Sequence, residues 1–254
     1  MSTGNVLALG AIAGATIFLG LPIARLKNPP RVLQGFLNAV ATGILFFLLY
    51  DVLSAASAPI NAALAGHRMD SFSFYLLALV GGLAIGLLGL VLFERRILRG
   101  SDGAPISGMH LGYMIAAGIG LHNFSEGLAI GQSASQGAIQ LATLLIIGFG
   151  LHNMTEGFGI SAPLAGRVPW RFILVAGLIG GGPTFLGSVV GVVFHATVIF
   201  VLFLALAAGS IIYVLCQLLP LLRRVPAHEL AMAGLVVGFA VAYGTDLVLI
   251  AAGA

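Results

Sequence analysis

Eight long apolar runs follow one another along the chain and leave little polar sequence between them. At about 1.5 Å per residue, a helix of roughly 20 residues crosses the hydrocarbon core of a bilayer. Apolar residues make up 59% of the 254 residues and charged residues only 7%, whereas soluble domains carry about 25% charged residues. We therefore predict an all-α membrane protein that forms a single transmembrane domain over residues 1–254. Its eight transmembrane helices are expected at about 6–24, 32–54, 72–93, 106–131, 137–161, 170–194, 197–222 and 229–252.

The positive charges indicate how these helices are oriented. Of the 11 Lys and Arg residues, all except Arg68 lie in the odd-numbered connections between the predicted spans. Cytoplasmic loops of membrane proteins carry an excess of Lys and Arg. The sequence therefore predicts that the odd-numbered loops are cytoplasmic and that both termini are extracytoplasmic.

A motif in the fourth predicted span recurs thirty residues later in the fifth. Leu121-His-Asn-Phe-Ser-Glu-Gly127 is followed by Leu151-His-Asn-Met-Thr-Glu-Gly157. On a helix, His and Glu at positions i and i+4 lie on one face, one turn apart. The two spans are expected to run antiparallel. Their polar faces should then meet near the middle of the membrane, as in transporter sites built from inverted elements.

Six ionisable side chains fall at membrane depth, which is costly unless they bind one another or a ligand. They are Asp51, His122, Glu126, His152, Glu156 and Asp246. No Lys or Arg lies inside the spans, so a cation or a proton must balance the acids. Imidazole, carboxylate and amide oxygen suit Zn²⁺, Fe²⁺, Mn²⁺ and related ions such as Cd²⁺, whereas Mg²⁺ and Ca²⁺ prefer oxygen ligands alone.

The doubled H-N-x-x-E-G motif resembles the ZIP (Zrt/Irt-like) family of divalent metal transporters. Further stretches are similar: Asp51 near the end of span two, Gly181-Gly-Pro183 in span six, and Ala207–Val214 with Gln217-Leu-Leu-Pro220 in span seven. The resemblance implies an eight-helix bundle, import of metal into the cytoplasm, and a metal site between spans four and five. Dimers are common in that family, so it also implies a homodimer. The implied ligands are His122, Asn123, Glu126, His152, Asn153 and Glu156, with Asp51, Gln217 and Asp246 as candidate residues of the transport pathway.

Several positions depart from the pattern that the resemblance implies. Ser125 and Thr155 stand where relatives commonly have Pro, so any helix kink would come from nearby glycines or from hydroxyl-to-carbonyl bonds. Gly182 and Gln217 replace acids that relatives often carry in spans six and seven. Two negative charges are then missing from the expected pathway, and the two repeated motifs supply most of the charge that remains.

We predict a transporter of divalent transition metal, foremost Zn²⁺, in the cell membrane, with no enzymatic activity and no prosthetic group. An importer that prefers Fe²⁺ or Mn²⁺ is the alternative within the same fold. An intramembrane metalloenzyme is a weaker alternative because no H-E-x-x-H motif occurs, and a cation channel would not need paired His–Asn–Glu sets. The expected partners are divalent metal ions and the lipid bilayer. The sequence has no nucleotide-binding P-loop and no basic domain for nucleic acid.

Overall fold

The computed structural model describes residues 3–25, 30–93, 95, 107–135, 149–150, 153–164, 168–193, 196–223 and 227–251. Within these ranges the chain is helical and contains no strand. The α-helices are α1 (Thr3–Ala15), α2 (Ile17–Gly20), α3 (Arg31–Ala65), α4 (Met69–Phe93), α5 (Gly108–Ser135), α7 (Trp170–Val193), α8 (Thr197–Leu222) and α9 (His228–Ala251). Short 3-10 helices, η1 (Leu21–Arg25) and η3 (Ala162–Leu164), follow α2 and a helical segment at 153–161.

Six helical stretches of the described chain are long and apolar enough to cross a membrane. They are Gly4–Arg25, Arg31–Ala65, Met69–Leu92, Trp170–Val193, Thr197–Pro220 and His228–Leu247. The chain is therefore a multi-pass membrane protein. Helix α5 has 28 residues, enough at about 1.5 Å per residue to cross the bilayer, but its His, Asn and Glu side chains lower its hydropathy. Most of the predicted fifth span, 137–161, lies outside the described residues.

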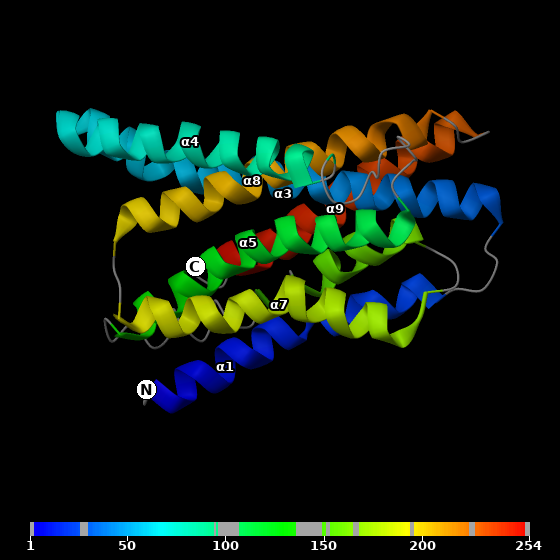
Figure 1. Cartoon of the computed structure of the whole chain (residues 1–254), viewed down its shortest axis with the longest axis horizontal. Coiled ribbons are helices and arrows are strands. Elements are labelled where there is room, and N and C mark those ends of the chain that lie inside the picture. Colours follow the sequence, from blue (N-terminus) through cyan, green and yellow to red (C-terminus); the bar gives the residue numbers. More distant parts are fainter. Residues whose placement is uncertain are drawn as a thin grey trace.

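The helices pack as two groups (Figure 1). In the first, which we call the site group, α7 packs against both α5 and α1, and the segment 153–161 packs against α2. In the second, which we call the flanking group, α3 packs against α9 and α8, and α8 packs against α4. Helices α5 and α8 form the main contact between the groups, where Phe124 stacks on Phe203 with ring centroids 4.2 Å apart.

Glycines bring the helices of each group into backbone contact. A Cβ atom at Gly127 of α5 would overlap the carbonyl oxygen of Thr184 in α7, and one at Gly187 of α7 would overlap that of Phe124. In the flanking group, Gly238 of α9 lies equally close to the carbonyl of Val40 in α3. Small residues allow this approach, which in membranes replaces the hydrophobic driving force between helices.

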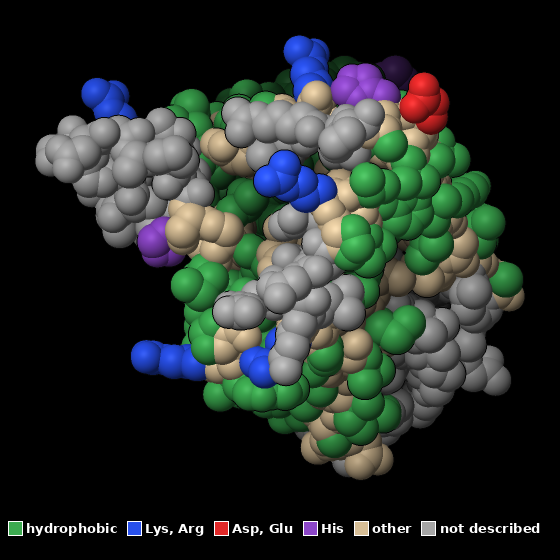
Figure 2. Space-filling view, turned by 90° about the vertical axis from the view of Figure 1, so that its right-hand side faces the viewer, with side chains coloured by type: hydrophobic (Ala, Val, Ile, Leu, Met, Phe, Trp, Pro, Cys, Tyr) green, Lys and Arg blue, Asp and Glu red, His purple; other side chains and the backbone are tan. Residues whose placement is uncertain are grey.

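Apart from Arg68, the positive side chains that the structure describes gather at one end of the bundle. Helices α3, α7 and α9 begin at this end and α4 and α8 finish there, on the right in Figure 1. Figure 2 shows Lys and Arg side chains spread around that end. There the guanidinium of Arg25 donates a hydrogen bond to the carbonyl of Val168 (2.9 Å) and lies 4.5 Å from the ring centroid of Trp170. The beginning of α1 and the end of α9 lie toward the opposite end (Figure 1).

Helix α3 is longer than the span predicted from hydropathy. The apolar run was expected to finish near residue 54, but the helix continues through Pro59 to Ala65. The added stretch is rich in Ala, a strong helix former that is only weakly apolar. Its 35 residues extend over about 52 Å, more than the hydrocarbon core requires.

Candidate metal site

Three charged or titratable side chains from the two motifs meet inside the site group. His122 and Glu126 lie one turn apart on α5, and Glu156 comes from the segment 153–161. The Nε2 atom of His122 is 3.3 Å from Oε1 of Glu126 and 3.8 Å from Oε1 of Glu156. All three are buried: 4%, 5% and 0% of their surfaces are exposed. The imidazole therefore connects two carboxylates that belong to different helices.

These separations are close to those that a shared metal ion requires. Two ligand atoms at about 2.1 Å from a tetrahedral Zn²⁺ lie roughly 3.4 Å apart. Within the described ranges, no group of three or more His, Cys, Asp or Glu side chains is placed to hold a metal ion by itself. A complete site therefore needs the Asn oxygens or His152, which lies outside the described residues.

The two motif asparagines are held in the same way on different partners. The Nδ2 atom of Asn123 donates to the carbonyl of Gly180 in α7, and Nδ2 of Asn153 donates to that of Ala13 in α1, both at 3.0 Å. Both side chains are fully buried, and neither Oδ1 atom has a hydrogen-bond partner in the described part of the chain. A carbonyl oxygen can only accept, so the amide nitrogen must face it. Each Oδ1 atom is left as an oriented acceptor beside its motif.

Two acids of the flanking group lie within electrostatic reach of this cluster. Asp51 of α3 and Asp246 of α9 are both half-buried. The charges of both interact with Glu126, and Asp51 also interacts with His122 and Glu156. The site thus lies in an acidic field, and every Lys and Arg that the structure describes lies at a helix end or in a loop. Such a field attracts cations and repels anions.

The remaining predicted residues are less closely tied to the cluster. Gln217 is half-buried on α8, and its part in a pathway stays a prediction. A side chain at residue 182 would point into an apolar groove. Gly182 lines an apolar groove between α1 and α7, and a Cβ atom there would meet nothing within 4 Å. It lies about 200° around α7 from Gly180, whose carbonyl holds Asn123.

The structure distinguishes the two possible sources of a bend at Ser125. A bond from the Ser125 hydroxyl to a backbone carbonyl was one of two possible sources of a bend in α5, beside the nearby glycines, but its buried Oγ atom has no hydrogen-bond partner among the described residues. Instead α5 runs as one helix from Gly108 to Ser135, and its glycines serve contact with α7. The carbonyl of Ile179, which Pro183 leaves without its helical donor, lies against Gly120.

The sequence did not single out two features of α7 that bear on this region. The carbonyl of Gly180 positions Asn123, a backbone role with no side-chain signature. Thr184 is fully buried at the junction of α1, α5 and α7, with an Oγ1 atom that has no hydrogen-bond partner in the described chain. In the sequence, only its position directly after Pro183 distinguishes Thr184 from other polar residues of the span.

The fold and the buried His, Glu and Asn side chains on facing helices define a multi-pass membrane protein with a polar site inside the bundle. Comparison with known families narrows this class. The family model described as ZIP Zinc transporter matches residues 98–245, more than half of the chain. The chain therefore belongs to the ZIP zinc transporter family, whose members transport divalent metal and are not enzymes. No curated protein sequence matches the chain.

Proposed function

We propose that this protein imports Zn²⁺ into the cytoplasm across the cell membrane, through a site formed by His122, Asn123, Glu126, His152, Asn153 and Glu156. The observation that carries the proposal is the contact of His122 with Glu126 and Glu156, because it joins the two repeated motifs. Family membership supports divalent metal as the substrate.

The donor set favours a borderline transition metal. The described donors combine an imidazole, two carboxylates and two amide oxygens without a thiolate, a set that suits Zn²⁺ and also accommodates Fe²⁺ or Mn²⁺. The two Glu carboxylates balance the charge of one divalent ion. Asp51 and Asp246 then raise the local cation concentration ahead of the site. The excess of Lys and Arg at the opposite end indicates which end faces the cytoplasm, and the inward direction follows from the resemblance to the family.

Uptake of metal by proteoliposomes tests the proposal. Purified protein is reconstituted into liposomes, Zn²⁺, Fe²⁺, Mn²⁺ and Cd²⁺ are offered in turn, and the metal accumulated inside is measured by elemental mass spectrometry, with Na⁺ and proton flux measured in parallel. Radioactive zinc accumulation by cells that express the chain gives the direction. We expect Zn²⁺ uptake to exceed that of the other ions and no sustained Na⁺ current.

Two variants address the site itself. His122→Ala and Glu156→Ala each remove a ligand and should lower uptake at least about 100-fold, because even indirect partners of metal ligands contribute 10–100-fold. The matched controls are His110→Ala on the same helix and Glu229→Ala on α9, both exposed, which should transport as the wild type does. If both site variants kept normal Zn²⁺ uptake, the proposed site would be wrong.

A further inference from the structure

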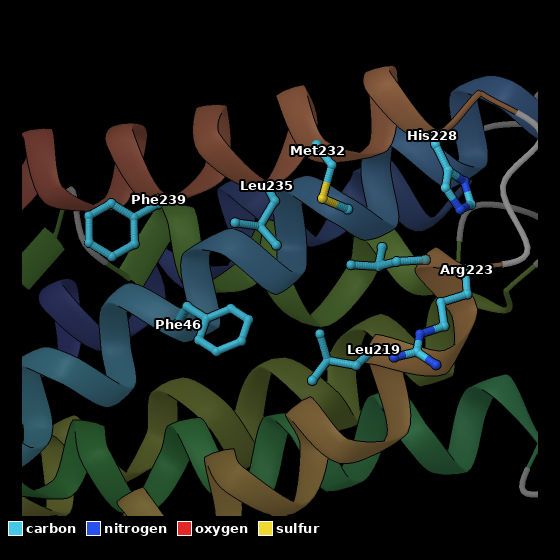
Figure 3. A pocket seen from close by; sticks show the side chains of 8 residues that line it. Phe46, Leu219, Arg223, His228, Met232, Leu235 and Phe239 are labelled. Atoms are coloured by element: carbon cyan, nitrogen blue, oxygen red, sulfur yellow. The ribbon is translucent and has the colours of Figure 1, made fainter.

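A crevice of about 580 Å³ lies between α3, α8 and α9, within the flanking group (Figure 3). Its size falls in the range of roughly 300–1,000 Å³ that is typical of small-molecule sites. None of the predicted metal ligands lines it. The crevice is therefore not part of the proposed metal site.

The residues that line the crevice are apolar at one end and basic at the other. Phe46, Leu235 and Phe239 line its apolar part, whereas the side chains of Arg223 and His228 lie at its other end (Figure 3). An occupant with a long apolar part and a polar or charged head would match this gradient, whereas a wholly polar solute would not.

The depth of the crevice matches one leaflet of the bilayer. His228 is the first residue of α9 and Phe239 lies eleven positions further along that helix. At about 1.5 Å per residue this is roughly 16 Å, half of the approximately 30 Å hydrocarbon core. Met232 and Phe239 remain 52% and 38% exposed, so the crevice opens sideways toward the surrounding lipid.

The charge at the head end favours an anion. Arg223 is exposed, and the ion pairs among the described residues do not include it. It lies at the end of the bundle where Lys and Arg gather, which the charge distribution predicts to be cytoplasmic. Anionic lipids are concentrated in that leaflet, and the planar guanidinium matches phosphate oxygens with two parallel hydrogen bonds.

We propose that this crevice binds an anionic phospholipid of the cytoplasmic leaflet, with its phosphate at Arg223 and His228 and an acyl chain along Met232 and Leu235. The lipid would join the end of α8 to the beginning of α9 on the outer face of the flanking group. This site is separate from the metal site, so it does not depend on the identity or direction of the transported ion.

Native mass spectrometry of the purified, detergent-released protein tests the proposal. The protein is mixed with phosphatidylglycerol or with phosphatidylcholine of the same acyl chains, and retained lipid is counted. We expect phosphatidylglycerol to be retained preferentially. Arg223→Gln should reduce its retention about fivefold, the effect of roughly one basic residue near an anionic lipid. Arg68→Gln, an exposed arginine in the loop between α3 and α4, should leave retention unchanged.

A second variant tests the apolar part independently. Met232→Trp places a large ring in the crevice and should displace the lipid while Arg223 is kept, and thermal unfolding in detergent checks that each variant is folded. Equal retention of the two lipids, or unchanged retention in both folded variants, would overturn the proposal. Displacement of the lipid by inorganic phosphate alone would also contradict it. If Met232→Trp abolished a dimer mass while lipid retention stayed constant, the crevice would be an interface between two copies.

Discussion

The site group and the flanking group are both held together through glycines, yet they bury different kinds of side chain. In the site group the packed interior includes His122, Asn123, Glu126, Asn153 and Glu156. In the flanking group the close contacts between α3 and α9 and between α4 and α8 are apolar, and its two acids are only half-buried. One group thus bears the polar site, and the other provides an apolar support with a partly charged edge.

The boundary between the two groups differs from the contacts within them. Every described glycine at which a Cβ atom would overlap a carbonyl of another helix meets a helix of its own group. Across the boundary, a Cβ atom at Gly118 would lie 3.1 Å from Cβ of Ser210, and one at Gly159 would lie 3.9 Å from Cγ2 of Ile44. In neither place would the added atom overlap a backbone carbonyl oxygen of the other group. Relative movement of the groups therefore disturbs fewer backbone contacts than movement within either group.

The largest expected effect comes from breaking a contact inside the site group. Gly127→Ala places a methyl group on the carbonyl of Thr184, so α5 and α7 must separate. We expect a loss of about 2–3 kcal/mol in the free energy of unfolding, at the upper end of the usual cost of overpacking. Unfolding in mixed detergent measures this loss, and Zn²⁺ uptake should fall with it.

The matched control for Gly127→Ala is the same substitution at a glycine whose added methyl group would contact no other helix. Gly89 of α4 is exposed, and a Cβ atom there would meet nothing within 4 Å. Gly89→Ala should be neutral or stabilise the helix by up to about 1 kcal/mol. If the two substitutions lowered the free energy of unfolding equally, close contact between helix backbones would not explain the effect of Gly127→Ala.

An intermediate effect is expected at the acidic edge of the flanking group. Asp51→Asn removes a charge that interacts with both His122 and Glu126 but leaves the shape of the side chain almost unchanged. We expect uptake at low Zn²⁺ concentration to fall about threefold to tenfold, through a higher KM, because the local field concentrates cations.

The concentration dependence of uptake separates this role from that of a metal ligand. Asp70→Asn changes an exposed acid in the first turn of α4 and should have no effect. A fall in maximal rate with unchanged KM in Asp51→Asn would contradict the proposed concentration of cations by Asp51.

The smallest effect on stability is expected at the boundary itself. Gly118→Ala brings a methyl group within 3.1 Å of the Ser210 Cβ atom, and the two side-chain groups need to shift by only a few tenths of an ångström. The free energy of unfolding should change by less than about 1 kcal/mol, below the usual cost of core overpacking. A loss as large as that of Gly127→Ala would remove the distinction between the boundary and the group interiors.

The sequence predicted much of this arrangement because membrane helices are governed by the length of apolar runs. The break between α7 and α8 falls at Val193 and Thr197, close to the predicted break between residues 194 and 197. The one-turn spacing of His122 and Glu126 follows directly from helical periodicity. The pairing of the two motifs could be anticipated because both carry the same costly side chains.

Other features depend on tertiary contacts that no local pattern encodes. The carbonyl partners of Asn123 and Asn153 come from α7 and α1, and their choice depends on how closely glycines allow these helices to approach. The direction of residue 182 depends on the rotation of α7 about its own axis. Hydropathy also locates the membrane-crossing part of a helix rather than its end, so the extension of α3 to Ala65 was missed.

The hydrogen bonds that the amide nitrogens of Asn123 and Asn153 donate to backbone carbonyls limit the charge of the proposed site. A carboxylate at either position would have no proton to donate to the carbonyl of Gly180 or of Ala13, so these places favour neutral ligands. With neutral imidazole, the negative charge of the proposed site then comes from Glu126 and Glu156, and one divalent ion brings its sum to zero. A loaded site of this kind would carry no net charge, whereas the empty site would keep the two negative charges of its glutamates, so membrane voltage would act on the ion as it enters and leaves the site.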